Sequence, residues 1–295
     1  MYDILHLYEP SSLHQALLMR QEHPQALILA GGSDILIKLR NGVYSQCSLI
    51  SIYGLDELRG ISLEPNGDLL IRPLSSFTAV ANHPLINKHI PVLAEALLHI
   101  GGPQIRNIGT IGGNICNGVT SADSASTLKA YDAMLTLSSL NGSRTLPYVD
   151  FNKAPQVVDI KEGEILTEIR IAQSSYEQTY GHYIKYAMRK AMDIATLGCS
   201  VNVRLTNDCK SISRLRMAFG VAAPIPIRCP SAEQAALGST LTSELIEKIA
   251  QMATADLKPR TSWRASKEFR LHLAHVLAER ATKAALEKAG GIIDG

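Results

Sequence analysis

The residue pattern best suited to chemistry is a pair of glycine-rich segments that share one design. The first spans residues 27–34 and the second residues 108–114, and each has an apolar run, two adjacent glycines and a small polar residue. Glycine lacks a Cβ atom, so its backbone can turn tightly and approach a ligand closely. Consecutive N–H groups in such a turn form a concave anion site. Two such turns suit a ligand with two phosphates, and the competing interpretation is two ordinary turns.

The elements around the first segment favour the anion site. Residues 26–30 read as an apolar strand that runs into the glycines, and a helical pattern follows from Asp34 to Asn41-Gly42. A phosphate at Gly31-Gly32 would therefore face a helix N-terminus, where free N–H groups and the helix dipole favour negative charge. The carboxylate of Asp34 is then expected to point away from the phosphate or to reach a ligand hydroxyl.

Other chemical machinery is missing from the sequence. It has no Gly-x-Gly-x-x-Gly after a strand, no Walker A motif and no Gly-x-Ser-x-Gly elbow. His272 and His275 lie three apart on a predicted helix without an evident third ligand, so we predict no metal site there. We also predict no catalytic side chain. A diphosphate site without acid–base residues fits a cofactor that carries its own chemistry.

Composition narrows the class of protein. The 295 residues are 46% hydrophobic and 19% charged, as in a soluble globular chain with a real core. A net charge of +2 is too small to indicate nucleic acid, and no apolar run reaches the length of a membrane span. The five cysteines are odd in number and form no Cys-x-x-Cys, which argues for a cytoplasmic chain without its own iron–sulfur cluster.

The remaining pattern predicts two domains. Polar residues 174–181 mark the boundary, and strands followed by helices after it indicate an α+β unit. Before it we expect helices at 12–23, 34–41, 86–100 and 120–129, strands at 26–30, 48–52 and 163–173, hairpins at 60–74 and 133–149, and an ordered Gly-rich loop at 101–118. After it we expect strands at 183–186, 198–205 and 215–221 and helices at 231–238, 242–257 and 264–288.

Several motifs together resemble the flavoprotein subunits of molybdenum hydroxylases, and most closely the FAD-binding subunits of bacterial xanthine dehydrogenases. The resemblance covers nearly the whole chain. The motifs are Ala30-Gly31-Gly32-Ser33-Asp34, Gly102-Pro103-Gln104-Ile105-Arg106-Asn107, Thr110-Ile111-Gly112-Gly113-Asn114, Thr120-Ser121-Ala122-Asp123-Ser124-Ala125, Lys185-Tyr186-Ala187-Met188-Arg189, Ala218-Phe219-Gly220-Val221-Ala222 and Trp263-Arg264-Ala265-Ser266-Lys267.

The resemblance implies a fold and a set of FAD-binding residues. The fold would be α+β: a two-lobed FAD-binding domain of the vanillyl-alcohol-oxidase (PCMH) type over residues 1–176, with lobes 1–55 and 56–176, and a C-terminal α+β domain of the CO-dehydrogenase flavoprotein type over 177–295. The cofactor-binding residues would be Leu27, Ile28, Leu29, Ala30, Gly31, Gly32, Ser33, Asp34, Gly109, Thr110, Ile111, Gly112, Gly113, Asn114, Asp123, Ile165 and Lys185. Without the resemblance, Asp123 reads equally as a helix first-turn acid and Lys185 as a solvated strand cation.

The implied function is electron transfer within a heterotrimer of purine metabolism. A molybdenum-cofactor subunit would hydroxylate the substrate, a 2Fe–2S subunit would carry the electrons, and FAD in this chain would pass them to NAD. Two alternatives stay open. One is the flavoprotein subunit of a related hydroxylase for carbon monoxide or an aromatic heterocycle, and the other is a non-catalytic nucleotide-binding assembly protein.

Overall fold

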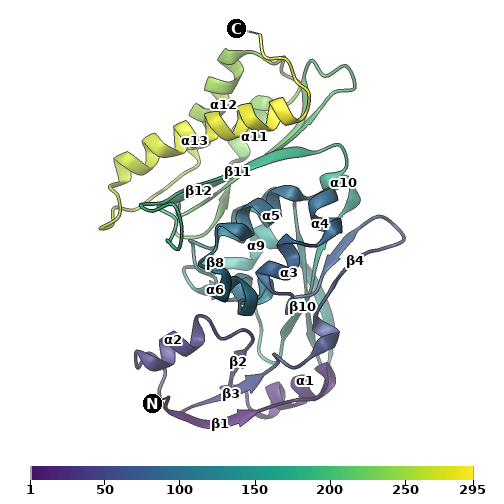
Figure 1. The fold of residues 1–295 in the computed structure, drawn as a ribbon, viewed down its shortest axis with the longest axis vertical. Helices are drawn as coiled ribbons and strands as arrows, with labels where there is room; N and C mark the ends of the chain where they lie inside the picture. Colours follow the sequence, from purple (N-terminus) through teal and green to yellow (C-terminus); the bar gives the residue numbers. More distant parts are fainter. Residues whose placement is uncertain (1, 295) are drawn as a thin grey trace.

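Three units follow one another along the long axis of the molecule in chain order, from the purple N-terminal lobe to the yellow-green C-terminal unit (Figure 1). The structure, a computed structural model, describes residues 2–294. Among these residues no helix is both long and apolar enough to cross a membrane. Mixed helices and strands throughout confirm the predicted α+β class.

The N-terminal lobe is a small parallel α/β unit, as predicted. Its sheet has the order β1-β3-β2, with β1 (Ile4–Tyr8) and β2 (Leu27–Leu29) both parallel to β3 (Cys47–Ser51). The Ser12 hydroxyl accepts from the Gln15 N–H and so caps α1 (Leu13–Glu22), which stabilises the helix start. Helix α2 (Ile35–Arg40) follows the first glycine pair and ends at Asn41.

The middle unit is built on an antiparallel sheet of order β4-β5-β10-β6-β7. Both predicted hairpins are present, as β4 (Ile61–Leu63) with β5 (Leu69–Ile71) and β6 (Met134–Ser139) with β7 (Gly142–Pro147). The predicted third strand is β10 (Ile165–Ile171), which pairs with β5 and β6 and joins the hairpins. Five of its seven residues are buried, as expected for a central strand.

Helices of the middle unit differ most from the expectations. The helix predicted over 86–100 is two helices, α4 (Pro84–His89) and α5 (Pro91–Leu98), because Pro91 cannot continue a helix but fits its first turn. The Gly-rich stretch 101–118, expected as a loop, holds α6 (Pro103–Ile108) and α7 (Ile111–Cys116). The other helical elements here are α3 (Phe77–Ala81), α8 (Asp123–Ala130), α9 (Tyr148–Phe151) and the 3₁₀ turn η1 (Asp56–Leu58), beside a short ribbon of β8 (Asn152–Ala154) and β9 (Val157–Val158).

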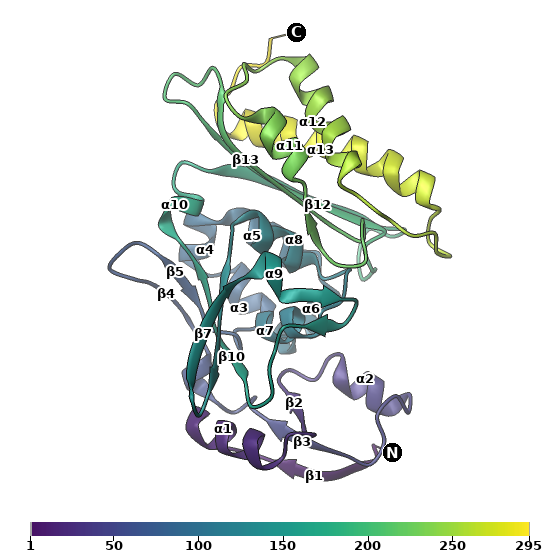
Figure 2. The ribbon, with the colours of Figure 1, turned by 180° about the vertical axis from the view of Figure 1, so that it is seen from behind.

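The C-terminal unit has the predicted order of strands followed by helices, after a short α10 (Gln173–Tyr176). Its antiparallel sheet runs β11-β12-β13-β14, and three helices pack on one face, as seen from behind in Figure 2. The strands are β11 (Tyr180–Tyr186), β12 (Leu197–Leu205), β13 (Ile212–Gly220) and β14 (Ile227–Arg228), and the helices are α11 (Pro230–Ala236), α12 (Ser243–Ala255) and α13 (Lys267–Lys288).

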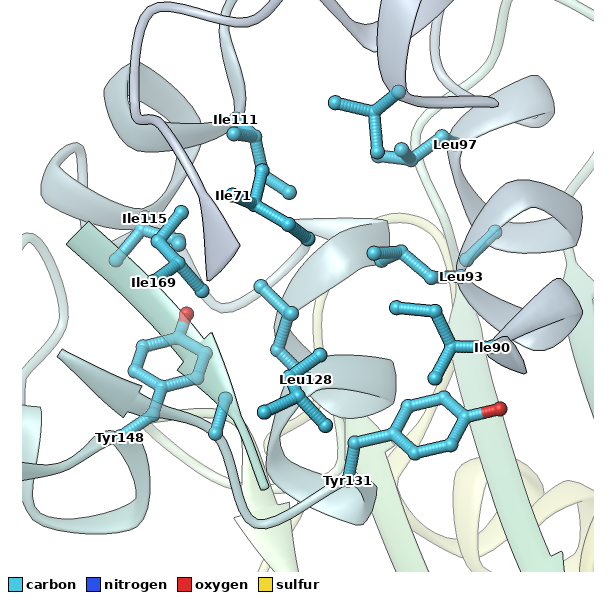
Figure 3. Packing of buried hydrophobic residues seen from close by; sticks show 14 of the residues in the cluster. Ile71, Ile90, Leu93, Leu97, Ile111, Ile115, Leu128, Tyr131, Tyr148 and Ile169 are labelled. Atoms are coloured by element: carbon cyan, nitrogen blue, oxygen red, sulfur yellow. The ribbon is translucent and has the colours of Figure 1, made fainter. Parts of the chain in front are cut away.

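Helix α8 joins the middle and C-terminal units. All eight of its residues are buried, because α5 packs on one side and β12 and β13 pack on the other. Leu128 points into the core of the middle unit, among Ile90, Leu93 and Tyr131 (Figure 3). The opposite face of the C-terminal sheet packs on its own helices, so β12 is buried on both faces.

Candidate cofactor site

The two glycine segments meet in space although they lie far apart in the chain. A Cβ atom on Gly31 would overlap the carbonyl oxygen of Ile108, so the two backbones touch at this point. Both segments border one cavity of about 640 Å³, a size typical of small-molecule sites. The cavity lies where the N-terminal lobe faces the middle unit, since residues of both line it.

Most of the predicted binding residues border this cavity. Those that line it are Leu27, Ile28, Ala30, Gly31, Gly32, Ser33, Asp34, Thr110, Gly112, Gly113, Asn114 and Ile165. Those outside its lining are Leu29, Gly109, Ile111, Asp123 and Lys185. Leu29 and Ile111 lie in secondary structure directly beside lining residues, and Asp123 and Lys185 form a separate pair described below.

The first glycine segment has the form of an anion cradle. Gly32 adopts a φ of 75°, a left-handed conformation that glycine takes without strain. Within the described chain, the N–H groups of residues 31–34 have no protein acceptor. These four donors precede α2 and border the cavity, so they are available to a negatively charged group. Asp34 is exposed and makes no capping hydrogen bond, which agrees with the expected orientation away from the anion.

The second glycine segment corrects the expectation of a matching N–H cradle. The N–H groups of Ile111, Gly112 and Gly113 donate to Ser75 O, Pro73 O and Thr110 Oγ1, at 3.0, 2.8 and 3.1 Å. These glycines therefore permit close packing instead. A Cβ on Gly112 would overlap Pro73, and one on Gly113 would lie 2.8 Å from Thr110 Oγ1. The second segment shapes the wall, and its amides are already bonded within the protein.

Two cations on the cavity wall were missed by sequence reasoning. Lys38 projects from α2, and its Nζ donates to Asn117 Oδ1 at 3.0 Å across the two lobes. Arg20 projects from α1, and its guanidinium donates to Ala26 O at 2.9 Å while its buried Nε has no partner in the described chain. Each lies on an amphipathic helix with other exposed cations, so nothing in the sequence pattern distinguishes them. Together they add positive charge beside the free amides.

Apolar side chains line the rest of the cavity. One group surrounds Ile165, on the strand β10 that enters the cavity from the middle unit, and another surrounds Ile100 and Phe77. The full apolar set is Leu27, Ile28, Ile52, Leu74, Phe77, Ile100, Ile105, Val157, Val158, Ile160, Ile165 and Leu166. Such walls suit planar rings, and the polar first turn suits a diphosphate between them.

Asp123 and Lys185 form a buried ion pair between the middle and C-terminal units. Lys185 Nζ lies 2.8 Å from Asp123 Oδ2, and each side chain is only 6% exposed. The alternative reading of Lys185 as a solvated strand cation is therefore wrong. Asp123 does lie in the first turn of α8, but the predicted caps Thr120 and Ser121 are replaced by Ala122, which makes no side-chain cap.

Cys116 is the cysteine that borders the cavity, and its thiol is chemically quiet. Burial raises its pKa to about 12, so almost none is thiolate at neutral pH. We expect iodoacetamide at pH 8 to modify the exposed Cys209 and to leave Cys116 intact, as read by peptide mass mapping. Alkylation of Cys116 as fast as Cys209 in the native chain would contradict this.

His275 has polar neighbours that were not foreseen, without becoming a metal site. Its Nε2 lies 3.1 Å from Glu247 Oε2 across α12 and α13, and Glu279 lies one turn further along α13. Glu247 and Glu279 are exposed, and exposed acidic groups commonly gather without an ion. His272 is not part of this group.

Comparison with known proteins agrees with this geometry. The family described as the FAD binding domain in molybdopterin dehydrogenase matches residues 3–173, and the CO dehydrogenase flavoprotein C-terminal domain matches 182–285. The chain is 43% identical to the putative xanthine dehydrogenase FAD-binding subunit of Escherichia coli K12, over 99% of both chains. It is 30% identical to the carbon monoxide dehydrogenase medium chain of Hydrogenophaga pseudoflava, over 94% of this chain and 96% of that one. A solved carbon monoxide dehydrogenase from H. pseudoflava superposes with a TM-score of 0.92 over 98% of this chain and 99% of that one, at 30% identity. The chain therefore belongs to the FAD-binding subunits of the molybdenum hydroxylases.

Proposed function

We propose that this chain is the electron-exit subunit of a xanthine dehydrogenase-like molybdenum hydroxylase, with FAD in the cavity and NAD as the electron acceptor. The observation that carries the proposal is the run of four free N–H groups at residues 31–34, on the wall of a cavity that the two glycine segments enclose. The 43% identity to an xanthine dehydrogenase FAD-binding subunit supports the choice of complex.

The residues of the cavity fit FAD in three parts. The amides of residues 31–34, with Arg20 and Lys38, would hold the diphosphate. The apolar walls around Ile165 and Ile100 would take the two ring systems. Bound FAD would supply the redox chemistry, accepting electrons singly and giving them up in pairs, as a hydride, to NAD.

The buried Lys185 would act from the C-terminal side. Its ammonium group, held near the cavity wall, would stabilise negative charge that develops on a reduced cofactor. Neither it nor Asp123 has to transfer a proton for electrons to pass. This agrees with the absence of an acid–base pair in the sequence motifs.

Partner subunits complete the proposal. The five cysteines are free and spread over the chain, so they do not gather as cluster ligands. A 2Fe–2S subunit would therefore deliver the electrons, and a molybdenum-cofactor subunit would hydroxylate the purine. The similar proteins from E. coli and H. pseudoflava are themselves named as a subunit and a medium chain.

A second substrate class has its own support. Relatives at 30–31% identity act in carbon monoxide dehydrogenase and in the nicotinate dehydrogenase of Eubacterium barkeri. The same electron-exit role would then serve a different molybdenum subunit. The higher identity to the xanthine dehydrogenase subunit favours the purine complex.

Purified full-length chain is expected to be yellow and to lose its flavin absorption when NADH is added without oxygen. It should also reduce an artificial dye with NADH, but it should not hydroxylate xanthine, because the proposed molybdenum centre lies on a partner. Anaerobic absorption spectroscopy and a xanthine assay measure both properties.

The outcomes separate the alternatives. A colourless chain with no affinity for FAD would favour a non-catalytic assembly protein. Bound FAD that dithionite reduces but NADH does not would remove NAD from the proposal and leave the flavoprotein role. Xanthine hydroxylation by the isolated chain would overturn the division between subunits.

A further inference from the structure

The geometry points to Tyr183 as a positioning residue that holds the Asp123 carboxylate ionised opposite Lys185. Through this pair, the C-terminal unit would set the charge beside the cofactor cavity. The effect on the cofactor rests on the proposed function, whereas the hydrogen bond between Tyr183 and Asp123 does not. No sequence motif singled out Tyr183.

Asp123 is fixed by a different donor on each oxygen. Tyr183 Oη donates to Oδ1 at 2.7 Å, and Lys185 Nζ donates to Oδ2 at 2.8 Å. Lys185 Nζ also donates to His99 O at 2.9 Å. Both oxygens of this buried carboxylate are therefore occupied, and each donor comes from β11.

The alternation of β11 explains why these two donors act together. Residues 183 and 185 lie two apart and so share one face of the strand, which packs against α5 and α8. Strand β12 leaves room for the hydroxyl, because a Cβ on Gly198 would lie 2.8 Å from Tyr183 Oη. The phenol thus occupies space that only a glycine in the paired strand leaves open.

Two short connections link the group to the cavity. Asn114 lines the cavity, and its Oδ1 accepts from the hydroxyl of Ser124, the residue after Asp123, at 2.6 Å. On the other side, His99 accepts from Lys185 and directly precedes Ile100, which also lines the cavity. A change in charge at Asp123 is therefore separated from the cavity by a single layer of residues.

The charge state of Asp123 depends on these donors. Burial raises the pKa of the Asp123 carboxyl, while Lys185, Tyr183 and His99 oppose that rise. Burial also raises the pKa of Tyr183 well above its usual value, so the phenol stays a donor, and it lowers the pKa of His99. Loss of the phenol hydroxyl removes one donor, and Asp123 then takes up a proton at higher pH.

Tyr183→Phe is expected to destabilise the apo chain in a pH-dependent way. A raised folded-state pKa means that stability from the protonated form is present at low pH and lost as pH rises. The variant should therefore melt about 5 °C below wild type at pH 8, with the difference shrinking as pH falls and Asp123 becomes protonated. Thermal unfolding from pH 4.5 to 8 measures it.

Two controls sharpen the result. Tyr148→Phe changes another buried tyrosine of the same core, which has no carboxylate partner, and its effect should not vary with pH. In an Asp123→Asn background, Tyr183→Phe should also lose its pH dependence. A cost of Tyr183→Phe that is equal at every pH, or unchanged by Asp123→Asn, would overturn the inference.

A redox measurement tests the connection to the cofactor. Protonated Asp123 leaves the charge of Lys185 unbalanced, so the flavin potential of Tyr183→Phe should move in the positive direction as pH falls, beyond the wild-type slope. An unchanged potential, with the pH-dependent melting present, would confine the role of Tyr183 to Asp123. A chain that binds no flavin would overturn the proposed function instead, because the melting experiment needs no cofactor.

Discussion

Gly31→Ala is expected to yield a chain that no longer retains FAD. The added Cβ would overlap the carbonyl oxygen of Ile108, which belongs to the backbone and cannot rotate away as a flexible side chain could. The two glycine segments must then separate, and the free N–H groups of residues 31–34 move from their places. We expect affinity for FAD to fall at least about 100-fold, which corresponds to roughly 2.7 kcal/mol.

The measurement is the flavin-to-protein ratio after purification, followed by titration of the apo chain with FAD. Gly54→Ala is the matched control, since Gly54 is in the same lobe, has an ordinary φ and has open space where a Cβ would lie. It should bind FAD as wild type does. Wild-type affinity in Gly31→Ala would show that the contact between the two segments is not required by the site.

Asp132→Asn is expected to lower the free energy of unfolding by about 2 kcal/mol. Asp132 accepts hydrogen bonds from Arg214, Arg216 and Arg228 of the C-terminal sheet, and so ties that sheet to the end of α8. Asparagine keeps the shape and tolerates the left-handed φ of 51°, but it removes the charge that three guanidinium groups share. Breaking a buried pair costs 3–5 kcal/mol, and the 34% exposure of Asp132 reduces that figure to about 2.

The pH dependence of this cost has a definite sign. Burial opposes ionisation of Asp132, but Arg228 and Arg216 outweigh it and hold its pKa below the usual value. A depressed pKa gives stability that is present above the unfolded-state pKa of about 3.9 and is lost as pH falls through the folded-state value. Urea unfolding should therefore show the full cost at pH 7 and a smaller one near pH 3.

Asp56→Asn is the control for a surface pair. Asp56 is 97% exposed and lies 3.5 Å from Arg59, so its removal should change stability by less than about 0.5 kcal/mol. An equal effect of Asp56→Asn and Asp132→Asn would show that the cluster between the two units is not special.

The fold was predictable where local signals are strong. Ser12, Thr242 and the Asn141-Gly142 turn gave correct helix starts and a correct hairpin, because each acts through its own side chain or backbone preference. The segment 101–118 was wrongly expected as a loop. Its glycines sit inside short helices that the surrounding structure stabilises, since Gly112 needs contact with Pro73, and tertiary packing of this kind leaves no periodic pattern.

The site was predictable in its backbone and less so in its charges. Glycine pairs announce themselves in sequence, and the structure brings the two together. The lining cations Arg20 and Lys38 and the donor Tyr183 could not be distinguished from ordinary helix and strand residues, because their roles depend on which elements face one another. The Asp123–Lys185 contact spans 62 positions of sequence and joins two units, beyond the reach of spacing arguments.

Helix α8 has a consequence for how this chain can be divided. Its side toward α5 belongs to the core that supports the cavity, while its other side is the floor on which β12 and β13 rest. Cutting after residue 176 would leave a strip of apolar surface in water on each fragment. Engineers who want to transplant the flavin module into another electron-transfer complex should therefore move residues 2–294 as one cartridge.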